Sequence, residues 1–299
     1  MNNRNILGIL LLASLWGPSF LFIKVAVHEI PPLTMAAARV TIAALILLVV
    51  LRLRKRALPK GRHMWLKFTI AGLFGNAMPF VLFNWGELYI DSALAAILNG
   101  TTPLFTLVIA HFFTDDDRLS TRKIIGAIIG FGGLLVLVAP SLFGGVEATT
   151  LGLLAVLLAA FCYGVNIVFT RTYLRGLPGL VAPAAQLSMA SVLLIPVALL
   201  VDQPYQLAFP SLPAVSSLFA LAIIGTGLAF IVYYRLLETT PASSMAMVTY
   251  LIPVFGIFLG VVVLNETLSW NAYVGCSLIL IGVMVVNKII RFPGKTVNV

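Results

Sequence analysis

Ten long runs of apolar residues, separated by turn residues and charges, dominate this sequence. A run of about twenty apolar residues is the length that crosses the hydrocarbon core of a bilayer as an α-helix. The sequence therefore predicts an all-α polytopic membrane protein with ten transmembrane helices. The predicted helices begin near Ile6, Leu33, Leu66, Ser92, Arg122, Thr150, Leu180, Pro213, Ala242 and Asn271.

The composition excludes a soluble domain. Hydrophobic residues make up 61% of the chain and charged residues 10%, and the mean hydropathy is +1.07. A water-facing surface needs far more charge than this. The two cysteines, Cys162 and Cys276, both fall inside apolar runs, so no disulfide framework is indicated.

The distribution of lysine and arginine predicts the orientation. When the apolar runs cross the membrane alternately, all but two of the 19 Lys and Arg residues, Lys24 and Arg39, fall on one side. Positive charge concentrates on the cytoplasmic side, so both termini are predicted to be cytoplasmic. This topology explains the net charge of +9 better than nucleic-acid binding does, because the basic residues are spread over separate short segments. They are Arg4, Arg52, Arg54, Lys55, Arg56, Lys60, Arg62, Lys67, Arg118, Arg122, Lys123, Arg171, Arg175, Arg235, Lys288, Arg291 and Lys295.

The second half of the chain repeats the pattern of the first half. With an offset of 150, the segment from Gly75 to Pro103 matches the segment from Gly225 to Pro253, and an offset of 147 applies earlier in the chain. The matched pairs include Trp16 with Tyr163, Ser19 with Asn166, Arg39 with Gln186, Gly75 with Gly225, Phe80 with Phe230, Phe83 with Tyr233 and Pro103 with Pro253. After a shift of one residue, Asp117 to Ser120 matches Glu266 to Ser269, and Gly126 and Gly133 match Gly275 and Gly282.

This repeat predicts two five-span units, residues 1–145 and residues 146–299. Because five is odd, the second unit enters the membrane the opposite way up, which makes the two repeats inverted. Inverted repeats are characteristic of secondary transporters, in which two similar halves rock around a site at the midplane. The alternative is a duplication that only enlarged a helical bundle.

Several short motifs resemble the EamA-type drug/metabolite transporters over essentially the whole chain. They are Leu15 to Phe20, Pro32 with Arg39, the prolines Pro103 and Pro253, and Asn265 to Ser269 followed by Gly275 and Gly282. Within that superfamily the chain is similar to the YddG-like exporters of aromatic amino acids. The resemblance implies export across the bacterial inner membrane. It also implies a central cavity lined by spans one to four and six to nine, with spans five and ten at the back.

Polar and aromatic residues gather near the predicted middle of several spans. A buried amide must face other helices or water, so these residues either form interhelical hydrogen bonds or line a wet cavity. We interpret the set as a substrate-binding site in which aromatic rings stack on a flat ring and amides bind polar groups. The candidate residues are Trp16, Ser19, Asn76, Phe80, Asn99, Tyr163, Asn166, Thr226 and Tyr250.

The absence of charged residues near the span centres narrows the class of substrate. No Asp or Glu falls near a span centre, which argues against a carboxylate-centred carrier of protons or organic cations. No Lys or Arg falls there either, which disfavours phosphorylated substrates. The prediction is a carrier of small neutral or zwitterionic metabolites, with aromatic amino acids as the first candidates.

Other residues are candidates for moving parts. Arg39, Lys24 and Glu87 lie toward the outer ends of their spans and form a candidate extracellular gate, although Arg39 alone could be a structural charge that reaches outward. Pro103 and Pro253 are repeat partners within spans and are candidate hinges, because proline removes a backbone donor and favours a kink.

No motif in the sequence indicates an enzyme, a cofactor or a metal. His28, His63 and His111 lie in separate segments, and there is no nucleotide-binding glycine motif or serine nucleophile motif. The expected partners are a small-molecule substrate and the lipid bilayer. A multidrug or nucleotide-sugar carrier is the alternative within the same class, and an intramembrane enzyme or assembly factor lies outside it. The Gly-x-x-x-Gly pairs at Gly126 and Gly256 suit close helix packing, in a monomer or a weak homodimer.

Overall fold

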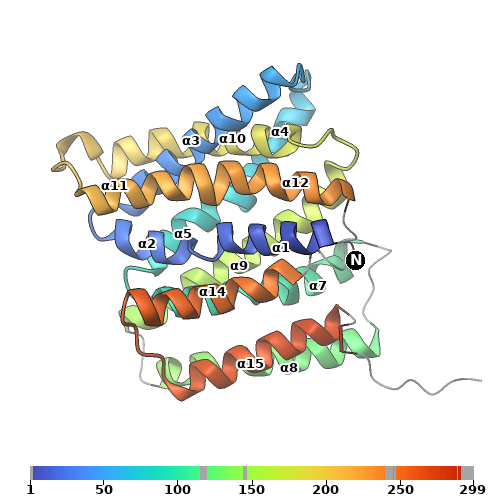
Figure 1. Ribbon diagram of the computed structural model, residues 1–299, viewed down its shortest axis with the longest axis vertical. Coiled ribbons are helices and arrows are strands. Elements are labelled where there is room, and N and C mark those ends of the chain that lie inside the picture. Colours follow the sequence, from blue (N-terminus) through green and yellow to red (C-terminus); the bar gives the residue numbers. More distant parts are fainter. Residues whose placement is uncertain are drawn as a thin grey trace, which may run out of the picture.

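The computed structural model describes residues 3–114, 120–143, 147–239, 245, 247–287 and 289–290. Every regular element in these residues is helical, and the helices lie alongside one another in layers (Figure 1). This confirms the predicted all-helical architecture. In the described residues, eight segments are long and apolar enough to cross a membrane, and they are followed by two shorter apolar helices, Met247–Val263 and Trp270–Val286.

The described residues of the first half of the chain form nine helical elements, several of which join end to end. They are α1 (Asn3–Trp16), α2 (Ser19–Val27), α3 (Pro32–Leu53), α4 (Arg62–Gly72), the π-helical η1 (Leu73–Ala77), α5 (Met78–Gly86), α6 (Ser92–Asn99), α7 (Thr102–Phe113) and α8 (Thr121–Phe143). The second half forms α9 (Ala148–Tyr173), α10 (Val181–Val201), the short η2 (Pro204–Gln206), α11 (Leu212–Phe219), the π-helical η3 (Ala220–Leu228), α12 (Ala229–Thr239), α14 (Met247–Val263) and α15 (Trp270–Val286).

Helices from the two halves pack on one another throughout. At the two edges of the molecule, α3 packs against α10 and α8 packs against α15 (Figure 1). Between these edges, α5 and α7 pack against α9, α6 packs against α14, and α1 packs against α12 and α14. The pair α8 and α15 therefore lies away from the middle. This is the position that the resemblance implies for spans five and ten.

Four of the eight apolar segments have irregular backbone near their middle. The first breaks at Gly17 and Pro18, between α1 and α2, and the fourth breaks at Gly100 and Thr101, between α6 and α7. The third and eighth are continuous but contain η1 and η3. A π-helical turn carries one extra residue and is frequent at functional sites. In η1 the wide turn comes just before Pro79, which has no backbone N–H to continue the regular ladder.

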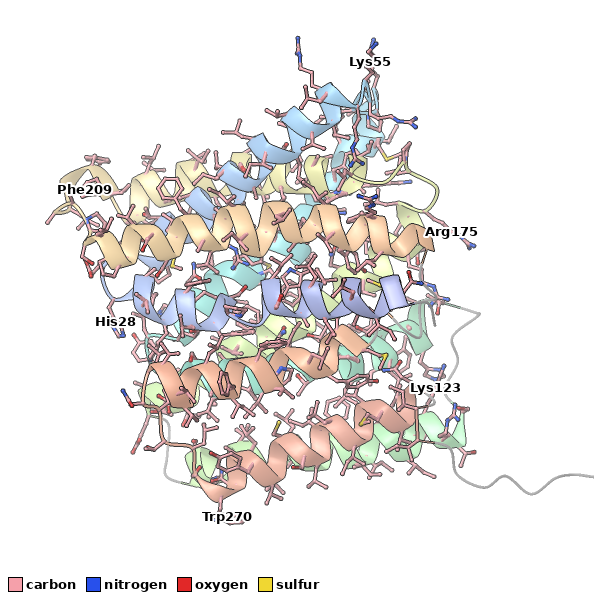
Figure 2. The ribbon with its side chains drawn as sticks, in the orientation of Figure 1. His28, Lys55, Lys123, Arg175, Phe209 and Trp270 are labelled. Carbon is pink, nitrogen blue, oxygen red and sulfur yellow. The ribbon has the colours of Figure 1, made fainter. Side chains whose placement is uncertain are left out.

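The two ends of the helical bundle differ in charge. Figure 2 shows Lys55, Lys123 and Arg175 at one end, which we call the basic end, and His28, Phe209 and Trp270 at the other, which we call the far end. This is the separation that the sequence predicted. That the basic end faces the cytoplasm stays a prediction. The basic residues Arg118, Lys288, Arg291 and Lys295 lie outside the described residues.

Glycines allow α8 and α15 to approach backbone to backbone. A Cβ added to Gly126 would lie 2.7 Å from the carbonyl oxygen of Gly282, and one added to Gly133 would lie 2.8 Å from that of Gly275. A Cβ on Gly282 would lie 2.5 Å from the backbone nitrogen of Gly130. These glycines pack inside one chain, so their spacing is accounted for without a second copy.

We expect Gly282→Ala to destabilise the protein, because its methyl group meets rigid backbone of α8 rather than a movable side chain. Overpacking of this kind costs about 1–3 kcal/mol. Thermal unfolding of the purified protein in detergent measures it. The matched control is Gly132→Ala in α8, where an added Cβ meets nothing within 4 Å. Equal melting temperatures for the two variants would contradict the close packing of α8 on α15.

Candidate functional site

One group of buried and partly buried polar and aromatic residues comes together in the middle of the fold, and several of its members lie on the segments with irregular backbone. We call it the central cluster. It comprises Ser19 on α2, Arg39 on α3, Asn76 on η1, Phe80 on α5, Tyr163 and Asn166 on α9, and Thr226 on η3. All but Arg39 are residues that the sequence analysis selected as substrate-binding candidates, and the predicted gate residue Arg39 lies among them.

Two glycines make room for polar side chains that cross between the halves. A Cβ on Gly75 would lie 2.6 Å from the amide carbon Cγ of Asn166, and a Cβ on Gly225 would lie 3.1 Å from Ser19 Oγ. Gly75 matches Gly225 and Ser19 matches Asn166 in the sequence repeat. The same contact is therefore made twice, once by each half on the other.

The aromatic side chains show the same duplication. Trp16 packs against Tyr233 with ring centroids 5.5 Å apart and an interplanar angle of 43°. Tyr163 packs against Phe83 at 5.9 Å and 32°. Trp16 matches Tyr163 in the sequence repeat, and Phe83 matches Tyr233. Two equivalent tilted pairs therefore each join one half of the chain to the other, and one of them includes Tyr163 of the central cluster.

Arg39 lies deeper than its position in the sequence suggests. Its side chain is 6% exposed, its guanidinium carbon lies 3.8 Å from the centroid of the Phe80 ring, and its Nε donates to Thr226 Oγ1 at 2.9 Å. The Thr226 hydroxyl in turn donates to the carbonyl of Leu221 at 2.8 Å. Phe80 and Thr226 are both midspan residues by sequence. The long side chain therefore brings a positive charge to the middle of the fold, which the sequence argument about span centres missed.

Some buried polar atoms of the cluster lack a protein partner. Ser19 Oγ and Asn76 Oδ1 make no hydrogen bond within the described residues. Leaving a buried polar group unpaired costs about 1–3 kcal/mol, so such atoms are uncommon and call for an explanation. Asn166 is better satisfied, because its Oδ1 accepts a hydrogen bond from Thr170 Oγ1 at 3.2 Å.

Two other predicted binding residues point elsewhere or lie apart. The Tyr250 hydroxyl donates to the carbonyl of Val283 at 3.2 Å and accepts from Asn287 Nδ2 at 2.8 Å, so its polar end contacts α15 and the residue after it. Asn99 ends α6 at the break before α7, where its backbone carbonyl accepts from Thr102 Oγ1 at 2.8 Å. Within the described residues, neither side chain forms a hydrogen bond or ring contact with the central cluster.

The predicted gate residues Lys24 and Glu87 meet near the far end. Lys24 Nζ donates to the backbone carbonyls of Glu87 and Ile90, at 2.8 Å each, and so binds the C-terminal end of α5. The Glu87 carboxylate is 0% exposed, and neither oxygen has a hydrogen-bond partner within the described residues. Lys24 and Glu87 are thus joined through the backbone, while Arg39 lies farther in.

Carboxylates from distant parts of the chain also cap three helix N-termini. Glu266 accepts the backbone N–H groups of Ser92 and Ala93 at 2.8 and 3.0 Å, at the start of α6. Asp202 accepts the N–H of Thr34 at 2.7 Å, in the first turn of α3. Unpaired N–H groups and the helix dipole make these places favourable for an anion. These caps could not be predicted from the sequence, because no local pattern reveals a cap that comes from more than a hundred residues away.

The third cap is made by Glu29, which accepts from both the backbone N–H and the hydroxyl of Ser211 at 2.6 Å. The Ser211 hydroxyl, and then its N–H, lower the pKa of Glu29 below its usual value. At Asp91, partial burial raises the pKa, and the neighbouring Glu266 carboxylate adds to the effect. Both groups lie between spans, at the far end.

Comparison with known proteins supports the class that this fold and cluster define, a multi-span membrane transporter. Residues 3–139 and 150–288 each match the EamA-like transporter family. The chain therefore belongs to the EamA-like transporter family, with two copies of its domain, and its homologues are transporters rather than enzymes.

The individual relatives agree with this placement. An uncharacterized transporter, YoaV of Bacillus subtilis, is 27% identical over 93% of this chain and 94% of its own length. The uncharacterized inner membrane transporter YedA of Escherichia coli is 28% identical over 95% of this chain and 90% of its own. A probable terminal-alkyne amino-acid exporter of Streptantibioticus cattleyicolor is 27% identical over 91% and 90%. One crystal structure shares the fold, with a TM-score of 0.68 at 21% identity, over 97% of this chain and 99% of that one.

We expect Glu266→Ala to loosen the far end, because it removes the carboxylate that caps α6. Loss of a helix cap costs about 1 kcal/mol. A cysteine placed at Ser92, with Cys162 and Cys276 replaced by serine, reports the opening through its rate of labelling by a membrane-impermeant thiol reagent. Glu147→Ala is the control, since Glu147 precedes α9 without a side-chain cap. Equal labelling rates in both backgrounds would rule out a role for Glu266 in closing this end.

Proposed function

We propose that this protein is a bacterial inner-membrane exporter of small neutral or zwitterionic metabolites, with aromatic amino acids as the first candidates. It carries them by alternating access through a site built on the central cluster. In this proposal ten transmembrane helices form two inverted repeats, residues 1–145 and 146–299, and both termini lie in the cytoplasm. The observation that carries the proposal is that equivalent residues of the two halves meet in equivalent contacts around that cluster.

Three sets of contacts support an inverted relation between the halves. The glycine contacts and the aromatic pairs of the central cluster each occur twice under the offsets found in the sequence. In α8 and α15, Gly126 meets Gly282 and Gly133 meets Gly275. The residue numbers of the contacts therefore increase along α8 while they decrease along α15. The two helices therefore run antiparallel, as an axis within the membrane plane would require.

The chemistry of the cluster supports a substrate with a flat apolar part and a polar end. The aromatic pairs offer ring surfaces, and Ser19 and Asn76 offer buried polar atoms without a protein partner. The name of the Streptantibioticus cattleyicolor relative, an amino-acid exporter, agrees with this chemistry. A monomer is sufficient for such a site, because every residue of the cluster comes from one chain.

Alternating access draws support from the far end and from the candidate hinges. At the far end, Lys24 and the carboxylate caps join segments far apart in the sequence, and we take these contacts to be the outer gate. A Cβ on Gly100 would lie 3.3 Å from the ring of Pro253, at the break that precedes Pro103. The two proposed hinge prolines therefore lie at one junction between the halves. Releasing the caps and bending there would open the far end.

A multidrug or nucleotide-sugar carrier remains the alternative within the family. A cationic drug calls for an acidic group, and the central cluster contains none. A nucleotide sugar calls for several cations, and the cluster contains Arg39 alone. Both alternatives are therefore less well supported than an amino acid.

We expect purified wild-type protein in liposomes to catalyse counterflow of labelled phenylalanine, and we expect unlabelled tryptophan to compete. Trp16→Ala and Asn166→Ala should each reduce the initial rate at least tenfold, because the first removes a ring of an aromatic pair beside the cluster and the second removes an amide from the cluster. Trp65→Ala is the control, since Trp65 packs on Phe68 outside the cluster.

Counterflow blocked by UDP-glucose or by a cationic dye, but not by amino acids, would replace the proposed substrate class with the alternative. Wild-type rates in both cluster variants would place the transport route elsewhere in the fold.

A further inference from the structure

We propose that Arg39 binds the carboxylate of the substrate, so that the transporter selects amino acids and related monocarboxylates over amines and amides of the same shape. This inference rests on the proposed function, because it takes the central cluster to be the substrate site. It adds a substrate group and the residue that recognises it.

Arg39 forms no salt bridge within the residues that the structure describes. In the described part of the chain, no carboxylate oxygen lies within 4.0 Å of its guanidinium, and only Nε donates a hydrogen bond. A buried cation without a partner is costly, more so in a membrane segment. The terminal Nη groups form a planar fork that matches the two oxygens of a carboxylate. An anion that binds there relieves the cost.

The guanidinium is fixed in place and does not reach out toward water. Phe80 of α5 lies against one face, and Thr226 of η3 holds Nε from the other half of the chain. Thr226 is itself held by the Leu221 carbonyl, through the wide turn of η3. With the ring face and Nε occupied, the Nη edge is the part of Arg39 left for a ligand.

The neighbours of Arg39 suit the rest of an amino acid. Asn76 lies four residues before Phe80, one helical turn away on the same face. Its unpaired Oδ1 is an acceptor, which an α-ammonium group satisfies. The tilted pairs Trp16 with Tyr233 and Tyr163 with Phe83 supply surface for an aromatic side chain. A single cation also matches one carboxylate better than a diphosphate.

Glu87 is the competing explanation for a buried arginine. Its carboxylate lies close enough to act on the charge of Arg39, although the two make no ion pair here. If Arg39 serves only as a structural counter-charge for Glu87, neutralising both residues together should restore whatever the loss of Arg39 removes. The two explanations therefore predict different results for the double variant.

The sequence repeat supplies a well-matched substitution. Gln186, the counterpart of Arg39, is buried in α10, so the fold accommodates glutamine at the equivalent place in the other half. Arg39→Gln removes the charge and keeps an amide. Arg39→Lys keeps the charge but loses the planar pair of Nη groups. It replaces Arg39→Gln as the test variant if Arg39→Gln does not fold. Lys67→Gln is the control, because Lys67 also lies over an aromatic ring, Tyr173, at the basic end.

The test is ligand binding to the full-length purified protein, measured by thermal stabilisation with phenylalanine, 3-phenylpropionate, phenylalaninamide and phenethylamine. We expect the wild type and Lys67→Gln to bind phenylalanine and 3-phenylpropionate and to reject the two compounds without a carboxylate. Arg39→Gln should weaken phenylalanine binding by about 10- to 100-fold, the range expected for charge-assisted hydrogen bonds. The affinity of Arg39→Lys for phenylalanine should lie between those of the wild type and Arg39→Gln. The double variant Arg39→Gln with Glu87→Gln should bind phenylalanine no better than Arg39→Gln does.

Three results would overturn the inference. They are wild-type binding of phenylalaninamide as tight as that of phenylalanine, full affinity for phenylalanine in Arg39→Gln, and recovery of affinity in the double variant. A different set of results would contradict the proposed function itself. The wild type would then bind none of the four compounds and show no phenylalanine counterflow, and the assignment of Arg39 would fall with it.

Discussion

The need to pair every backbone N–H and C=O group inside hydrocarbon governs this structure. It makes all described elements helical, and it confines irregular backbone to places that other helices surround. The break at Gly17 and Pro18 and the π-helical turns η1 and η3 all lie in the middle of the fold. There, the Thr226 side chain takes up a carbonyl of the wide turn, and η1 and η3 contribute Asn76 and Thr226 to the central cluster. In this fold, irregular backbone lies next to the candidate site.

At the far end, side chains rather than irregular backbone pair the free backbone groups of the helix ends. Helices that begin there expose N–H groups, and carboxylates from the other half of the chain accept them. Glu266 caps α6 and Glu29 caps the start of α11, each across the boundary between the repeats. Lys24 does the reverse at the C-terminal end of α5, where it binds carbonyls. These contacts are polar, lie near water and are few. They can therefore be broken at modest cost, whereas the glycine-packed α8 and α15 cannot separate so easily. This contrast suits a protein whose ends open while its edges stay rigid.

Much of this could be predicted from the sequence, and the failures have physical causes. Apolar run length and the placement of lysine and arginine gave the helices and the basic end, because both are one-dimensional properties. The repeat predicted which residues would be equivalent, and Ser19 and Asn166 do make equivalent contacts. The depth of Arg39 was missed because a long side chain carries its charge several ångströms from its backbone position. Tyr250 was placed in the site because its depth was right, yet its hydroxyl bonds toward α15, and depth alone does not give direction. The caps depend on contacts between distant segments.

The central claim is that the cluster faces each side of the membrane in turn. The most direct test is a single cysteine at Ser19, with Cys162 and Cys276 replaced by serine, labelled by an impermeant thiol reagent in intact cells and in inverted vesicles. With Lys24 and the carboxylate caps holding the far end, we expect faster labelling in inverted vesicles, slower but measurable labelling in cells, and protection by phenylalanine from both sides. A cysteine that reacts from neither side would contradict the account, and so would one that reacts from a single side whatever the conditions.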